Sequence, residues 1–329
     1  MTVASPPPLA RAAAPAKVIL LGEHAVVYGH PALAAPITAV GVEATVWPGD
    51  GAGLSIASRW PDGRADVDVA LAGDDVPMAV AVRATFARLN VEDLPSWRIA
   101  VQSTIPPGRG MGSSAAVAVA LVRAVAAAAG AALDDAAVSE LAMESERIVH
   151  GRPSGIDNAC VAIGRPIWFE AGAIRRAPVG RTLGLVVADS GRFSSTRAMV
   201  EAVRAARTAD PAGIDAVLSE LGDLTVRGAA ALAEGDGAAL GRAMTAAHDG
   251  LRRLGVSTPD LDRLADAAAR AGAFGAKLAG SGGGGVIVAA CPPQDAAHIA
   301  AACRHAGAPW TCRAVLDADG EAATAPGRG

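Results

Sequence analysis

The two lysines of this 329-residue chain lie in segments whose residue types could act on a phosphate. Lys17 lies in PAKVILLGEHAVVYG and Lys277 lies in GAKLAGSGGGG, while every other member of the 29 Lys and Arg residues is an arginine. An ammonium group is compact and a guanidinium is planar and wide, so a retained lysine marks a place where a guanidinium does not fit. We expect Lys17 to act on an anion; for Lys277, placement by chance stays open as the alternative.

A glycine-rich turn at residues 105–117, IPPGRGMGSSAAV, could hold an anion. Its three glycines are Gly108, Gly110 and Gly112. They join an expected strand to an expected helix, and a backbone without Cβ atoms can approach a phosphate closely. The first N–H groups of the helix add a partial positive charge, and Ser113 and Ser114 add two hydroxyls. The turn matches neither the GK[ST] of a Walker A loop nor GxGxxG. It therefore predicts a phosphate cradle of another kind, and a tight turn before a serine-capped helix is the alternative.

Two acidic residues follow this turn where a carboxylate could take part in catalysis or bind a metal. Asp157 lies in GRPSGIDNAC, in an expected loop after a helix, and a simple turn residue is the alternative there. Glu146 lies on the preceding helix, where a rotation of about 100° per residue places it on the flank of the expected buried stripe. From there it could reach into a cleft as a metal ligand or form a surface salt bridge. The expected stripe consists of Val138, Leu141, Ala142, Ser145 and Val149.

A second glycine-rich loop, GAKLAGSGGGGVIVA at residues 275–289, leads into an expected strand. Consecutive glycines cost conformational entropy when they become ordered, and a purely structural turn rarely needs four of them. Close approach to a ligand or to the other domain explains this loop better.

Composition excludes several classes of protein. The chain is 51% hydrophobic, mostly Ala and Val, and only 3% aromatic, which predicts a tightly packed core of small residues. No uninterrupted apolar stretch reaches about 18 residues, so no membrane span is expected. A net charge of −4 with scattered arginines argues against a nucleic-acid surface. The cysteines show neither CxxC pairing nor zinc spacing, which is typical of reduced, mostly buried thiols of a cytosolic protein. They are Cys160, Cys291, Cys303 and Cys312.

Hydrophobic periodicity and capping residues predict helices and strands in mixed order, without regular βαβ units, and therefore an α+β architecture. The expected strands are 17–21, 37–46, 97–103, 167–169, 181–191 and 285–290, with a last helix–strand unit at 294–317. The expected helices are 79–90, 113–129, 134–150, 196–207, 211–221, 226–250 and 259–272. The polar RRAPVG before residue 181 is the expected domain junction. We therefore expect a disordered lead-in at 1–14 that is not a signal peptide, domains at 15–180 and 181–317, and a frayed tail at 318–329.

Together these segments resemble those of the GHMP kinase superfamily, and within it those of its mevalonate kinases. The matching segments are PAKVILLGEHAVVYGHPALA (15–34), PPGRGMGSSAA (106–116), GRPSGIDNA (151–159), STRAMV (195–200), HDGLRRLGVSTPDLDRL (248–264) and KLAGSGGGG (277–285). The resemblance implies a two-domain GHMP kinase fold, with a ribosomal-S5-like N-terminal domain, a ferredoxin-like C-terminal domain and the active site in the cleft between them. It also implies an ATP- and Mg²⁺-dependent kinase that phosphorylates the C5 hydroxyl of (R)-mevalonate to 5-phosphomevalonate in isoprenoid precursor biosynthesis.

The resemblance further assigns roles to individual residues. Asp157 would accept the proton of the attacking hydroxyl, and Lys17 would hold that carboxylate ionised and neutralise charge on the transferred phosphoryl group. Ser114 and Glu146 would bind Mg²⁺. The ATP phosphates would be held by Pro107, Gly108, Arg109, Gly110, Met111, Gly112, Ser113 and Ser114. The substrate would be held by Glu23, His24, Thr196, Gly280, Ser281, Gly282 and Gly283.

One departure from the family pattern bears on the substrate. Related kinases often carry Arg two positions before the TR of the STR segment, whereas this chain has Ser194 there and Arg192 two residues earlier. Either Arg192 binds the substrate carboxylate from a shifted loop, or the substrate differs. The alternatives are another GHMP kinase, acting on phosphomevalonate or a sugar, and a non-catalytic nucleotide-binding sensor. A homodimer is common among the related kinases and is expected here, while the cysteine pattern, the charge and the hydropathy predict a cytoplasmic protein without nucleic-acid or membrane partners.

Overall fold

Two long strands, β1 (Ala10–Leu21) and β2 (Ala32–Pro48), each contribute residues to both of the units into which the chain divides. The computed structural model describes residues 6–51, 53–60, 63–69, 72–151, 153–193 and 195–319. Unit 1 consists of Met1–Lys17, Val40–Pro107 and Met111–Gly164. Unit 2 consists of Val18–Ala39, Gly108–Gly110 and Arg165–Gly329. Each unit is assembled from separate segments, whereas the sequence predicts two continuous domains at 15–180 and 181–317. Those continuous domains stay a prediction.

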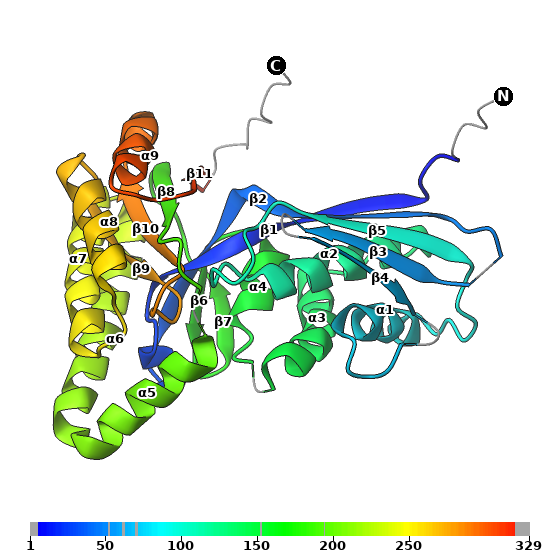
Figure 1. The fold of residues 1–329 in the computed structure, drawn as a ribbon, viewed down its shortest axis with the longest axis horizontal. Helices are drawn as coiled ribbons and strands as arrows, with labels where there is room; N and C mark the ends of the chain where they lie inside the picture. The colour runs from blue at the N-terminus through cyan, green and yellow to red at the C-terminus, as the bar shows by residue number, and fades with distance from the viewer. Residues whose placement is uncertain are drawn as a thin grey trace. The chain divides into compact units, whose positions relative to one another are not determined.

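Unit 1 combines a sheet with four helices that pack together on one of its faces (Figure 1). Its strands β3 (Ser55–Trp60), β4 (Gly63–Asp68) and β5 (Trp97–Ser103) follow the order β4-β3-β5-β2. Its helices are α1 (Pro77–Arg88), α2 (Ser113–Ala128), α3 (Asp135–His150) and α4 (Ile156–Ile163). α2 is mostly Ala and Val, and it contacts all three other helices and β5. A helix that is apolar on all sides is buried, so α2 forms the centre of this unit.

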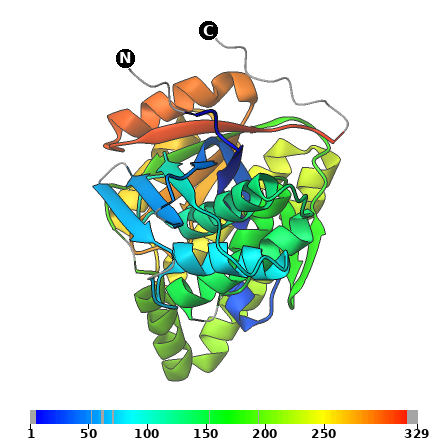
Figure 2. The same cartoon turned by 90° about the vertical axis from the view of Figure 1, so that its right-hand side faces the viewer.

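Unit 2 contains an antiparallel four-stranded sheet of order β11-β8-β10-β9. The strands of the unit are β6 (Ile167–Glu170), β7 (Ala173–Arg176), β8 (Leu183–Asp189), β9 (Gly275–Ala279), β10 (Val286–Cys291) and β11 (Thr311–Leu316). The helices are α5 (Thr196–Ala209), α6 (Pro211–Glu234), α7 (Gly237–Arg253), α8 (Pro259–Arg270) and α9 (Ala296–His305), with short 3-10 turns at Ala25–Tyr28 and Pro293–Asp295. β8, β9 and β10 are buried along their whole length because α7, α8 and α9 pack on them. Figure 2 shows α9 lying along β11.

The expected α+β class is confirmed. At both ends of the described chain, ordered structure covers more residues than the sequence predicts. β1 begins at Ala10 and not at residue 17, so the disordered lead-in expected at 1–14 is too long. Alanine is depleted in strands, which is why the alanine-rich start of β1 is not predicted. At the other end, the Asp319 N–H donates to Val179 O at 2.9 Å, so the frayed tail expected from residue 318 begins too early. Residues 1–5 and 320–329 lie outside the described ranges.

The break between the two longest helices also differs from the prediction. The sequence predicts helices at 211–221 and 226–250, whereas α6 continues through Gly222 and ends at Glu234, just before Gly235, which has φ +73°. A Cβ on Gly222 would lie 2.5 Å from His30 Nδ1, so this glycine allows a close approach inside a helix and does not end it.

The cysteines are all free, and Cys160, Cys291 and Cys303 are buried. No helix in the described part of the chain is long and apolar enough to cross a membrane.

Candidate active site

Lys17 and Asp157 form an ion pair within unit 1, with Lys17 Nζ 3.0 Å from Asp157 Oδ1. Lys17 lies on β1 and is 4% exposed. Asp157 lies in the first turn of α4, and not in a loop as the sequence predicts, because Gly155 at φ +89° starts the helix just before it. The positive end of a helix and a neighbouring ammonium both favour a negative charge at this position. The cation and the carboxylate that the sequence places in one site therefore do meet, while their roles stay a prediction.

Glu146 on α3 is a buried carboxylate that lies near this pair. It is 1% exposed, and burial raises its pKa, although a hydrogen bond with Ser114 lowers it in part. Glu146 Oε1 is buried and has no hydrogen-bond partner among the described residues. Leaving such an oxygen without a partner is costly, so this position calls for a cation or a donor. The sequence predicts Glu146 on the flank of a stripe that includes Val149; the structure instead buries Glu146 and leaves Val149 44% exposed.

The oxygen atoms of Glu146 and Ser114 fit Mg²⁺, which is a hard cation that prefers oxygen ligands. Within the described ranges, no group of three or more His, Cys, Asp or Glu residues is placed to hold a metal by itself. Mg²⁺ commonly takes few protein carboxylates and completes its shell with substrate phosphates and water. A donor set this small would suit a metal that arrives with a nucleotide.

His150 belongs to the same cluster and is not predicted from the sequence. Its Nε2 lies 3.4 Å from Ser114 Oγ and 3.6 Å from Glu146 Oε2. It follows Glu146 by one helical turn on α3, and residues four apart share a helix face. That spacing from an expected metal ligand is the sequence signal that could have indicated it.

The glycine-rich turn packs closely on Lys17. Met111 O accepts the Lys17 N–H at 3.0 Å, and a Cβ on Gly112 would lie 2.8 Å from Lys17 Cγ. Gly112 also has φ +69°, so both backbone conformation and space require glycine there. As the N-cap of α2, Gly112 supplies no side-chain cap, which leaves the first N–H groups of α2 to an anion. Ser113 and Ser114 follow at the same end of the helix and are half-buried.

The part of the turn that belongs to unit 2, Gly108–Gly110, is fixed by an ion pair. Arg109 Nε donates to Asp189 Oδ2 at 2.8 Å, and Asp189 is buried at the end of β8. Asp189 Oδ1 in turn accepts the Gly191 N–H at 2.8 Å. Arg109, which the sequence predicts to hold phosphates, therefore keeps only its other N–H groups for a ligand.

The second glycine-rich loop packs on the segment that follows α7. The Gly283 N–H donates to Val256 O at 2.7 Å, and a Cβ on Gly282 would lie 2.1 Å from the same oxygen. Gly280 and Gly282–Gly285 all have positive φ. Part of the glycine run is therefore required by packing within unit 2, in addition to any approach to a ligand.

The expected substrate residues of unit 2 lie together. His24 Nε2 is 2.8 Å from Ser281 O, and Ser281 Oγ donates to Thr196 Oγ1 at 3.4 Å. Burial lowers the pKa of His24, so its ring is neutral at pH 7. Glu23 is 3% exposed, and its carboxylate pairs with Lys277. The predicted substrate residues thus converge from the N-terminal segment, α5 and the glycine-rich loop.

Comparison with known proteins identifies the family to which the chain belongs. The family model for the GHMP kinases N terminal domain matches residues 73–165, and that for the GHMP kinases C terminal matches residues 229–308. A mevalonate kinase of Thermococcus sibiricus is 35% identical over 312 residues, which cover 90% of this chain and 93% of that protein. One of Aeropyrum pernix is 36% identical over 287 residues, which cover 83% of this chain and 86% of that protein. The chain belongs to the GHMP kinase family.

The fold of this GHMP kinase is also that of a solved relative. The crystal structure of L. major mevalonate kinase in complex with R-mevalonate has a TM-score of 0.81 to this chain, with 27% identity, and covers 94% of this chain and 96% of its own. The expected two-domain GHMP kinase fold is therefore confirmed. Membership of a kinase family also implies that this chain uses ATP.

The departure at Ser194 cannot be followed, since that residue lies outside the described ranges. Arg192, the expected substitute for the usual arginine, pairs with Asp260. Asp260 also lies 2.7 Å from Arg263 Nη2. The pair uses Arg192 Nε, so a substrate carboxylate would have to be bound by the other N–H groups of Arg192.

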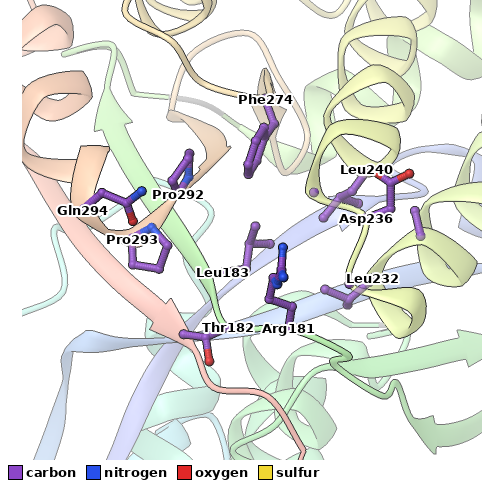
Figure 3. Close-up of a pocket in the computed structure, with 13 residues that line it drawn as sticks. Arg181, Thr182, Leu183, Leu232, Asp236, Leu240, Phe274, Pro292, Pro293 and Gln294 are labelled. Carbon is purple, nitrogen blue, oxygen red and sulfur yellow. The ribbon is translucent and has the colours of Figure 1, made fainter.

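A cavity of about 350 Å³ in unit 2 is lined by none of the predicted site residues (Figure 3). Its lining mixes apolar side chains, such as Leu183, Leu232 and Phe274, with the guanidinium of Arg181. The chemistry expected of a GHMP kinase is therefore assigned to the glycine-rich segments and not to this cavity.

Proposed function

We propose that this GHMP kinase transfers the γ-phosphoryl group of ATP to the C5 hydroxyl of (R)-mevalonate and releases 5-phosphomevalonate and ADP. The observation that carries the proposal is the 3.0 Å ion pair between Lys17 and Asp157 beside the glycine-rich turn. The similarity to mevalonate kinases of Thermococcus sibiricus and Aeropyrum pernix supports mevalonate over phosphomevalonate or a sugar as the acceptor. The retained lysine, serine and acidic residues argue against a non-catalytic sensor.

Asp157 and Lys17 divide the chemistry of the transfer. Asp157 accepts the proton of the C5 hydroxyl while that oxygen bonds to the γ-phosphorus and the bond from the γ-phosphorus to the departing ADP oxygen breaks. Lys17 lies beside Asp157 and neutralises charge on the transferred group. A buried ammonium is well suited to this task, because a charge–charge interaction is stronger where water is excluded.

The residues around the nucleotide position it and neutralise its charge. Gly108–Ser114, which follow Pro107, surround the phosphates with backbone N–H groups and with the hydroxyls of Ser113 and Ser114. Glu146 and Ser114 would hold Mg²⁺, and the partnerless buried oxygen of Glu146 supports this assignment. When bound, Mg²⁺ would neutralise negative charge on the β- and γ-phosphate oxygens.

The acceptor is held by residues of unit 2. His24, Thr196 and Ser281 offer polar groups that already contact one another, and Gly280, Gly282 and Gly283 let the backbone come close to a ligand. The crystallised L. major relative contains R-mevalonate, which supports the same class of acceptor here. The homodimer and the cytoplasmic location stay predictions, and light scattering on the purified protein measures the oligomeric state.

A substrate panel tests the proposal. The protein is incubated with Mg-ATP and, in parallel, with (R)-mevalonate, 5-phosphomevalonate and galactose, and ADP release is followed by a coupled assay. Of the three acceptors, we expect only (R)-mevalonate to be turned over, and its product should be phosphorylated at C5. Turnover with one of the other acceptors and none with mevalonate would replace the proposed substrate, and ATP binding without turnover of any acceptor would favour the sensor.

A further inference from the structure

The second lysine of the chain is buried in the sheet of unit 2. Lys277 lies in the middle of β9 and is 0% exposed. Its Nζ pairs with the carboxylate of Glu23 and also donates to Leu278 O at 2.6 Å. A guanidinium would need more width and more acceptors than this site supplies. Its burial explains why the chain keeps a lysine here, and a site closed to solvent means that Lys277 does not bind an anionic ligand from solution.

Glu23, the partner of Lys277, is connected to His24 and Gly280 of the acceptor site, and through His24 to Ser281. Glu23 directly precedes His24, and the Gly280 N–H donates to the Glu23 carboxylate. His24 reaches on to the Ser281 carbonyl. One carboxylate therefore connects β9, the His24 turn and the start of the glycine-rich loop.

The His24 turn needs such support because its backbone is unfavourable. His24 has φ +59° and ψ −45°, a positive-φ conformation that a residue with a side chain rarely adopts. Unfavourable backbone conformations persist only where the surrounding contacts hold them, and they concentrate at functional sites. The contacts on either side of His24 are the buried Glu23–Lys277 pair and the bond to Ser281.

The protonation of the pair depends on both partners being present. Burial raises the pKa of Glu23 and lowers the pKa of Lys277, and each partner's charge opposes that shift in the other. If one partner is removed, the other is left in an apolar setting without its charge partner. The remaining group then changes its protonation or its position.

We infer that Lys277 is a positioning residue for the phosphoryl acceptor: through Glu23 it fixes the His24 turn and the start of the glycine-rich loop without touching the substrate. The inference rests on the proposed function, and it deepens it by assigning Glu23 a role inside the protein instead of a contact with the substrate. A buried pair that served stability alone would leave acceptor binding unchanged in any variant that still folds.

Steady-state kinetics of Lys277→Met separate these two roles. We expect the KM for mevalonate to rise about tenfold or more, the KM for ATP to stay within about twofold and kcat to change less than the KM for mevalonate, as for the loss of an interaction that orders the acceptor site. Lys277→Arg should not restore the wild-type KM. In Glu23→Gln/Lys277→Met the unpaired buried charge is gone, so thermal stability should recover relative to Lys277→Met while the KM for mevalonate stays high.

His248→Ala is the matched control. His248 Nδ1 accepts the Leu278 N–H at 3.2 Å, so this variant loosens the same strand without touching Glu23. We expect its KM for mevalonate to stay within about twofold of the wild-type value. An equal rise in KM in His248→Ala, an equal rise in the two KM values of Lys277→Met, or an unchanged KM for mevalonate in folded Lys277→Met would each overturn the inference.

Hydrogen exchange gives a readout that does not depend on the acceptor. Amides at residues 22–26 and 279–284 should exchange faster in Lys277→Met than in His248→Ala, and equal exchange would count against the inference. If Lys277→Met does not fold, Glu23→Gln is measured in the same way, with the same outcomes deciding. If wild-type protein turns over a different acceptor, the proposed substrate fails, while the KM split on that acceptor still decides the role of Lys277.

Discussion

Replacing Gly112 with alanine should impair catalysis through Lys17 without removing any functional group. Gly112 has φ +69°, and its missing side chain leaves room for the stem of Lys17. A Cβ there would lie 2.8 Å from Lys17 Cγ and 3.0 Å from Cε, while non-bonded carbon atoms prefer about 3.5–4.0 Å. The stem cannot swing freely, because the Lys17 N–H is bonded to Met111 O and Nζ is paired with Asp157.

Two effects of different size follow from this geometry. The left-handed backbone conformation costs a residue with a side chain roughly 1–2 kcal/mol, which lowers the free energy of unfolding. The contact moves Lys17 by about half an ångström to one ångström, and a misplacement of about 1 Å can cost about a hundredfold in rate. We therefore expect kcat to fall by roughly ten- to a hundredfold in Gly112→Ala.

Gly130→Ala separates these two effects. Gly130 follows α2 at its other end, has φ +75° and has no atom within 4 Å of the Cβ position. It carries the same backbone cost without a collision. Both variants are compared by kcat at saturating mevalonate and ATP and by chemical unfolding. We expect similar losses of stability and a loss of kcat in Gly112→Ala alone; kcat values within twofold of each other would refute the argument that Gly112 makes room for Lys17.

Four further predictions follow from the site. Asp157→Asn should lower kcat by roughly 10²–10⁴-fold with ATP affinity nearly intact, as for a lost general base, and kcat near the wild-type value would remove Asp157 from that role. Lys17→Arg should lower kcat by about tenfold or more, because the wider guanidinium does not fit beside Gly112; full activity would show that any cation serves. Glu146→Ala should raise the Mg²⁺ concentration for half-maximal activity by roughly tenfold or more, and an unchanged metal dependence would point to another ligand. Burial lowers the pKa of His24 below 6.5, so the unfolded chain takes up a proton that the folded chain does not. The free energy of unfolding should therefore fall as the pH drops through 6.5, and urea titrations should show a shallower fall in His24→Gln; identical pH profiles would contradict this.

The position of the site along the chain could be predicted because its chemistry depends on residue types that are informative by themselves. Lys17 stands out in an arginine-rich chain, and the glycines and serines of residues 108–114 have few uses other than a close approach to an anion. The pairing of Lys17 with Asp157 agrees with that prediction. Capped helices such as α8, expected at 259–272 and observed at Pro259–Arg270, were also predictable, because periodicity accumulates over several turns.

Elements without a periodic signal could not be predicted. α4 has eight residues and is mostly apolar, so Asp157 was expected in a loop although it begins this helix. β9, which contains Lys277, is buried on both faces, and a strand of that kind shows no alternation of polar and apolar residues. The burial of Glu146 depends on how α3 packs against α2 and α4, which the composition of α3 alone does not contain.

The division of the chain has a consequence for the order in which this protein folds during synthesis. Val18–Ala39 belongs to unit 2, although it is made long before the rest of that unit. Leu21 fills the space left by Gly228 of α6, where a Cβ would lie 2.1 Å from Leu21 Cδ1, and Ala32–Ala34 pair with β6. A fragment that begins at Arg165 lacks these contacts, so the space beside Gly228 would stay unfilled and β6 would lack β2 as a partner. On the ribosome the early segment must therefore wait for α6 before it can dock, which makes the completion of unit 2 a late event in translation.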